Sequence, residues 1–310
     1  MKALAAASLA LVAVAGSARR GSRALPADLM PKFRDMAGEA LLNSDPALVR
    51  QLREVWISLG GGDRIDLPRL NLVFGKGNVP NWDDFDLHNV NLDFLGLLSS
   101  TYPPGAVGLN LVDATLRHAS LTRCQWTRSA LDRADFTQAN LDDTDFSDST
   151  MRKATLVGAV LRQSWIVRLN AAGADFTGAD LQGSQCDEAI FERAKLAGAH
   201  LGGCYMTGAH FGRADLRAVT ASRGLFTEAK FMKADLRGST FEYSGLRGAD
   251  FRMADLRGAD LHGADLAGAN LKGARLDGVN WNRAKITPQT LFDTAFTTDP
   301  RFGKLGLVTQ

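Results

Sequence analysis

The chain has 310 residues, 45% of them hydrophobic and 23% charged, which allows one large domain with its own core. Its 36 basic and 34 acidic side chains leave a formal charge of +2. A chain so close to neutral lacks the dense negative charge that an imitation of the nucleic-acid backbone requires. Basic and acidic residues also alternate along it, so the sequence predicts no continuous basic groove for nucleic acid.

Residues 1–18 are typical of a signal peptide, because Lys2 supplies a positive start, an apolar run follows, and Ala13-Val14-Ala15 fits a small-residue cleavage site. The apolar run is too short to cross a bilayer. A basic, Ser-rich segment up to residue 26 resembles the start of an organellar transit segment. We therefore expect export through the secretory pathway to a periplasmic, extracellular or organelle-lumen location, with the plastid or thylakoid lumen as the alternative. The other interpretation keeps the segment as an N-terminal helix.

Residues 27–62 predict two helices. The second begins with Asp45 as N-cap and Pro46 at the first helical position, Leu48 and Leu52 follow at helical spacing, and three glycines end it. We expect the two apolar stripes to cover the N-terminal end of the repeat array that follows, where unpaired strand edges would bind other chains. A helix pair that binds a partner is the alternative.

Residues 63–98 have a large apolar residue at many positions five apart, although Gly77 interrupts the series. This segment predicts one or two imperfect coils. Residues 99–108, which include Pro103-Pro104-Gly105, predict a protruding loop insertion that shifts the frame. The large residues of the imperfect coils are Leu67, Leu72, Trp82, Leu87, Leu92 and Leu97.

Residues 109–296 carry the most regular pattern, in which a large apolar residue recurs every five positions from Leu111 onward. A small residue, most often Ala, stands two positions earlier, and Asp, Asn or Thr lies between them. Gly often closes the unit, as at Gly258 and Gly263. A period of five fits neither an α-helix nor a single strand. A repeat of fixed period predicts a solenoid whose units bury their apolar faces only against their neighbours.

The unit Ala-(Asp/Asn)-Leu-X-Gly resembles the motif of the pentapeptide-repeat family. This resemblance implies an all-β fold, a right-handed quadrilateral parallel β-helix with four pentapeptides per coil and the large residue and Ala facing inward. We expect a short helix from Thr287 and the tail at 297–310 to cap the C-terminal end, with Phe292 sealing it. Solenoid ends mediate dimers in some members of this family, so the resemblance also allows a homodimer through one end.

Four coil-forming pentapeptides would place residues 20 apart in one column of one face. Two neighbouring columns of one face then carry acidic and basic residues. We expect these columns to share solvated ion pairs, each worth about 0–1 kcal/mol, and the alternative is an anion-binding arginine stripe. The residues of this charged ladder are Asp215, Asp235, Asp255, Arg217, Arg237 and Arg257.

Another face carries Trp165, Val167, Tyr205 and Leu225, all expected to point outward. Exposed apolar and aromatic side chains that gather on one surface are candidates for a protein contact. The alternative is that one or two of them face inward through a local bulge or are tolerated at the surface.

The remaining chemical groups do not predict catalysis. Cys124, Cys186 and Cys204 fall in columns of core residues and are expected to be buried free thiols. The five histidines never adopt the spacing of metal ligands, so we expect neither a metal site nor a cofactor.

The sequence therefore predicts a non-enzymatic scaffold, a rigid rod that presents side-chain ladders to an unidentified protein partner, with no transmembrane segment in the mature chain. The alternative is a DNA-mimic regulator of a topoisomerase, which the resemblance allows. The near-neutral charge and the expected export signal disfavour that alternative, and we expect no nucleic-acid partner.

Overall fold

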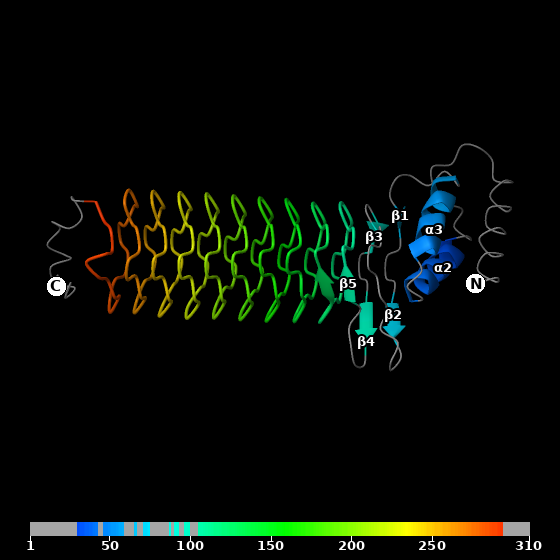
Figure 1. Ribbon diagram of the computed structural model, residues 1–310, viewed down its shortest axis with the longest axis horizontal. Helices are drawn as coiled ribbons and strands as arrows, with labels where there is room; N and C mark the ends of the chain where they lie inside the picture. The colour runs from blue at the N-terminus through cyan, green and yellow to red at the C-terminus, as the bar shows by residue number, and fades with distance from the viewer. Residues whose placement is uncertain are drawn as a thin grey trace.

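The computed structural model shows a long rod of stacked coils with two helices at its N-terminal end (Figure 1). The predicted signal peptide, the segment up to residue 26 and the tail at 297–310 lie outside the residues that the structure describes. No helix within the described ranges is long and apolar enough to cross a membrane. These ranges are 30–42, 46–58, 65–66, 71–74, 87, 90–92, 96–99 and 105–293.

The two helices are α2 (Met30–Leu42) and α3 (Pro46–Ser58), and both lie within the segment for which the sequence predicts helices. Helix α3 starts at the proline, whose missing N–H and fixed φ suit the first helical position. Phe33 of α2 and Leu52 of α3 are buried in the same apolar cluster as Leu92 of the first coils. The helices thus share their core with the N-terminal end of the rod.

The first coils are larger than the later ones. Strand β1 (Ile65–Asp66) pairs in parallel with β3 (Val90–Asn91), and β2 (Asn71–Phe74) pairs in parallel with β4 (Gly96–Ser99). The partners in both pairs lie farther apart in the sequence than those of the later coils. Ile65 pairs with Val90, for example, whereas Asn110 pairs with Ala130. Each early turn of the chain therefore contains one pentapeptide more than a later one.

The loop predicted at residues 99–108 is wrong at both of its ends. Ser99 is the last residue of β4, and Gly105–Val107 forms β5, which pairs with β6 (Gln125–Thr127). The edge of the coil beginning at β6 offers unpaired backbone groups, and β5 satisfies them. Residues 100–104 lie outside the described ranges.

The main array is held by parallel bridges that recur at every fifth position and join each residue to its counterpart four pentapeptides later. Each coil therefore has four sides, and the solenoid predicted from the period of five is confirmed. We name the sides by their first bridge: face A from Asn110–Ala130, face B from Thr115–Asp135, face C from Ser120–Asn140 and face D from Gln125–Asp145.

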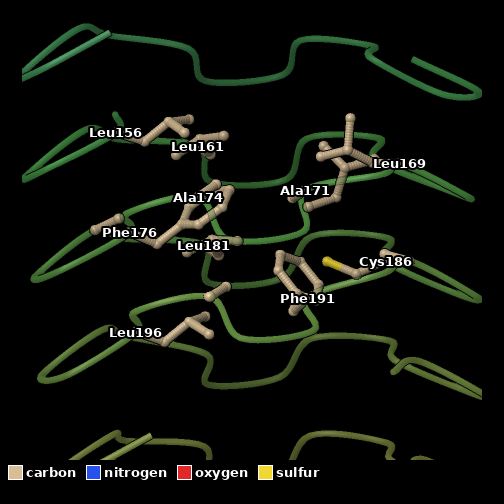
Figure 2. Close-up of a cluster of buried hydrophobic side chains, with 14 of the residues drawn as sticks. Leu156, Leu161, Leu169, Ala171, Ala174, Phe176, Leu181, Cys186, Phe191 and Leu196 are labelled. Atoms are coloured by element: carbon tan, nitrogen blue, oxygen red, sulfur yellow. The ribbon is translucent and has the colours of Figure 1, made fainter. Parts of the chain in front are cut away.

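Large and small inward residues fill the tube. Figure 2 shows Leu156, Phe176 and Leu196 pointing between the coils, together with Phe191 of face A. All four are fully buried. Burial of one such side chain contributes about 1.5–3 kcal/mol. On face A, phenylalanines on four successive coils stack with nearly parallel rings, with the closest pair, Phe231 and Phe251, at 4.8 Å between ring centroids.

Small polar residues of face D donate hydrogen bonds to backbone carbonyls inside the tube. Ser164 donates to the carbonyl of Leu141 at 2.8 Å, and Cys204 donates its S–H to the carbonyl of Leu181, also at 2.8 Å. Each acceptor precedes its donor by the same interval along the chain, so hydroxyl and thiol groups occupy the same place and make the same bond. Cys204 is therefore a structural residue, and all three cysteines are buried and free, as predicted.

The corners require left-handed backbone. We call the second residue after each inward large residue the corner position. It has a positive φ, for example 65° at Gly238 and 60° at Arg213. Glycine adopts this conformation without steric cost, whereas L-residues are disfavoured there and β-branched ones most of all. From residue 113 to 283 no Val, Ile or Thr occupies a corner position.

The helix predicted from Thr287 is wrong within the described residues. Residues 288–290 form a turn, and Asn270 pairs with Leu291, whereas the regular series would pair it with Thr290. The backbone of Leu291 thereby satisfies the edge of the last full coil, which a helix would leave unpaired. The extra residue shifts the frame, so Leu291 is 40% exposed and Phe292 packs instead, with its ring centroid 6.2 Å from that of Trp281.

Candidate interaction surfaces

Face D presents an apolar column made of Trp165, Tyr205 and Leu225. Their side chains are 55%, 44% and 44% exposed, respectively. Gln185 separates the tryptophan from the tyrosine, and consecutive members of the series are joined by parallel bridges. Coils are spaced like neighbouring strands, about 4.8 Å apart. Val167 lies in the next column of the same face and is half-buried.

Glycines lie beside two members of the apolar column. Gly203 and Gly208 occupy the corners on either side of Tyr205. A Cβ atom added to Gly245 would lie 3.1 Å from Cδ2 of Leu225, so the leucine side chain lies over this glycine. Tyr205 therefore has no side chain at either neighbouring corner, whereas Trp165 lies between the exposed corner residues Gln163 and Arg168.

Face B, on the opposite side of the coil, carries the charged ladder. Arg217 donates to both carboxylate oxygens of Asp215 at 2.7 and 2.6 Å, and it also approaches Asp235 at 3.8 Å. Arg237 repeats this arrangement one coil later, at 2.7 Å from Asp235 and 3.9 Å from Asp255. Each arginine therefore links the carboxylates of two coils.

The ladder ends in a denser group. Asp255 lies 2.6 Å from Arg257 and 3.6 Å from Arg275. The hydrogen bond from Arg257 holds the pKa of Asp255 below its usual value, and Arg217 does the same for the pKa of Asp215. Because the guanidinium groups already bind carboxylates in a two-pronged geometry, a free anion would have to compete with them. The contacts fit shared ion pairs better than an anion-binding stripe.

The repeats are recognised independently. The sequence model described as Pentapeptide repeats matches this chain in eight copies. The chain belongs to the pentapeptide-repeat family. The matched residues are 110–148, 129–164, 154–193, 174–213, 209–252 and 244–283.

Solved structures of other pentapeptide-repeat proteins are similar to this one. HetL, a pentapeptide repeat protein involved in heterocyst differentiation regulation in the cyanobacterium Nostoc sp. strain PCC 7120, is 24% identical over 72% of this chain and 88% of its own, with a TM-score of 0.36. QnrB1, a plasmid-mediated fluoroquinolone resistance protein, is 19% identical over 65% of this chain and 97% of its own, with a TM-score of 0.46. A search of curated proteins finds no match.

This pentapeptide-repeat protein also has ion pairs that we did not predict from its sequence. Arg133 donates to Asp113 at 2.6 Å, and Arg168 donates to Asp148 at 2.7 Å. Both pairs join the corner positions of successive coils. The signal for them was present in the sequence, since an Asp and an Arg at the same position of consecutive coils bring their side chains together.

A tyrosine and a histidine form another contact that we did not foresee. The hydroxyl of Tyr243 lies 2.9 Å from Nε2 of His262, with the two rings edge to face. The tyrosine ring lies over Gly263, where an added Cβ atom would come within 2.6 Å of it. Within the described ranges, no group of three or more His, Cys, Asp or Glu residues could hold a metal ion.

Proposed function

We propose that this chain is a right-handed β-helical rod that works as a non-enzymatic scaffold and binds a protein partner through face D. The observation that carries the proposal is the apolar column, whose three large exposed side chains share one column, whereas Met232, Tyr243 and Met253 are exposed but lie in three different columns. Exposed aromatic side chains supply much of the energy of protein interfaces, because they bury a large area and lose few rotamers.

Rigidity supports the role of a scaffold. Every coil from residue 110 onward is tied to the next by parallel bridges and by a continuous buried core. Side chains in one column thus project from a fixed backbone at regular spacing. A partner that binds the column therefore loses little free energy to ordering of the rod. We place the helix pair α2 and α3 as the N-terminal cap that covers the first coil.

Export of the protein is part of the proposal. The apolar run and the cleavage-like Ala13-Val14-Ala15 support a secretory signal. The rival function, imitation of DNA to regulate a topoisomerase, requires a dense and uniform negative charge. The charged ladder on face B neutralises its own carboxylates with arginines, so it does not provide such a surface.

The test is affinity purification of a C-terminally tagged copy from its native cells, with sequencing of the mature N-terminus. We expect a stable co-purifying protein that is lost when Trp165 and Tyr205 are both changed to Ser. The matched control changes Met232 and Met253 to Ser, since these side chains are also exposed but lie where faces A and B meet, away from face D.

Two results would overturn the proposal. Equal loss of the partner in the control variant would show that face D has no special role. An uncleaved protein that captures a topoisomerase would favour the DNA mimic. Light scattering on the same preparation tests the homodimer, which we place at a solenoid end.

A further inference from the structure

A line of basic side chains runs along the corner between faces A and B. Arg193, Arg213 and Lys233 occupy the corner position on three successive coils, and all three are exposed. Lys153 stands two coils before the first of them. A Cβ atom added to Gly173 would lie 3.6 Å from Cγ of Lys153, so the stem of the lysine side chain lies over this glycine. We call these four basic residues the basic edge.

The basic edge differs from two other corner positions of this rod, at which an arginine is paired with an aspartate. Arg133 and Arg168 each find an aspartate at the corner one coil earlier, at 2.6 and 2.7 Å. Arg213 and Lys233 instead find another cation there. Within the part of the chain that the structure describes, neither makes an ion pair, and the same holds for Arg193. Their charges are therefore available to a ligand outside the protein.

The line is narrow. On face A it is bordered by Glu192, whose Cγ lies 3.8 Å from the position of a Cβ on Gly212. On face B it is bordered by Asp215, which is neutralised by Arg217. A wide polyanion such as a nucleic-acid duplex would bring its second strand against these carboxylates. Exposed Met232, next to Lys233 in the chain, offers apolar contact beside the charges.

The spacing of the coils bears on the class of ligand. The cations of the basic edge follow the coils, about 4.8 Å apart. Phosphates of a DNA strand recur about every 3.4 Å along the helix axis, and residues of an extended peptide about every 3.3 Å along the strand. A chain of linked pyranose rings with one carboxylate per ring repeats near the strand spacing, and its flat ring faces suit apolar side chains.

We propose that the basic edge binds an acidic polysaccharide laid along the rod. Face A separates this edge from the apolar column of face D, so one molecule can hold the polysaccharide and a protein partner at once. The proposal does not rest on the proposed function, because neither its residues nor its ligand is shared with face D.

The experiment measures binding of a fluorescently labelled polygalacturonate fragment to the full-length protein by anisotropy at several salt concentrations. The test variant carries Arg193→Gly, Arg213→Gly and Lys233→Gly. Glycine suits these positions, where φ is 57°, 60° and 61°, so the variant is expected to fold. We expect binding to weaken by about tenfold or more and the salt dependence to fall by roughly two to three charges.

The matched control carries Arg123→Gly, Arg223→Gly and Arg283→Gly, which removes the same charge from corner positions on the diagonally opposite edge. We expect it to bind like the unmodified protein. Equal weakening in the control, unchanged binding in the test variant, or equal affinity for an uncharged glucan fragment would each overturn the proposal. Tighter binding of a single-stranded oligonucleotide with the same dependence on the basic edge would assign the edge to nucleic acid instead.

Discussion

The aromatic stack on face A gives the sharpest test of how the rod is held together. Phe211 lies between Phe191 and Phe231, with ring centroids at 5.2 and 5.0 Å and interplanar angles of 6° and 3°. Phe211→Ala removes a fully buried ring and leaves a cavity between rigid coils, which we expect to cost about 3–5 kcal/mol of unfolding free energy. Each lost stacked pair contributes about 0.5–1.5 kcal/mol of that cost. Equilibrium unfolding in guanidinium, followed by circular dichroism, measures the loss.

The matched control is Phe251→Ala. Phe251 is equally buried, but the only ring it stacks on among the described residues is Phe231, at 4.8 Å. We expect this variant to be less destabilised than Phe211→Ala by one stacking contribution, about 0.5–1.5 kcal/mol. Equal costs, or a cost for Phe211→Ala under about 1 kcal/mol, would refute the view that the stack holds neighbouring coils together.

Three further predictions concern the corners, the charged ladder and the thiols. Gly238→Val is expected to destabilise the fold by about 1–2 kcal/mol in thermal unfolding, and Gly238→Asn by less. A Cβ atom added to Gly238 would meet no atom within 4 Å, so the cost comes only from the left-handed backbone conformation. The pKa of Asp215 is lowered in the folded state, so its contribution is present above the unfolded pKa and lost as pH falls through the folded one. Asp215→Asn should therefore remove a small part of the acid-induced loss of stability, under about 1 kcal/mol after solvent screening. Burial raises the pKa of the Cys124 and Cys186 thiols, so a thiol reagent should label neither until the protein is unfolded.

The inward and outward columns could be predicted because the period of five and the four-sided coil fix both at once. The position within the five-residue repeat predicts that Trp165 points outward and that Phe211 points inward, and their exposure agrees. The partner-binding role of face D stays a prediction, since the repeat dictates where a side chain points and not what it meets.

The ends of the array could not be predicted in the same way. Leu291 follows the period in the sequence, yet the turn at residues 288–290 moves it to the surface. The extra residue in this turn leaves the period of five in the sequence unchanged. The shift of the frame is visible only in the backbone pairing of Asn270 with Leu291. The alternation of Arg and Asp, which predicts no continuous basic groove, is true of face B but not of the corner that holds Arg213 and Lys233.

In the main array, the bridges join residues four pentapeptides apart, so the rod consists of equivalent coils of four repeats each. Inserting or deleting one whole coil would change its length by about 4.8 Å and leave every side chain on its original face. Inserting a single pentapeptide would preserve the inward pattern but turn everything after it by one side, which would bring the distal half of the apolar column onto a neighbouring face. Within the main array, a change in rod length that keeps every surface column intact therefore has to come in steps of four repeats.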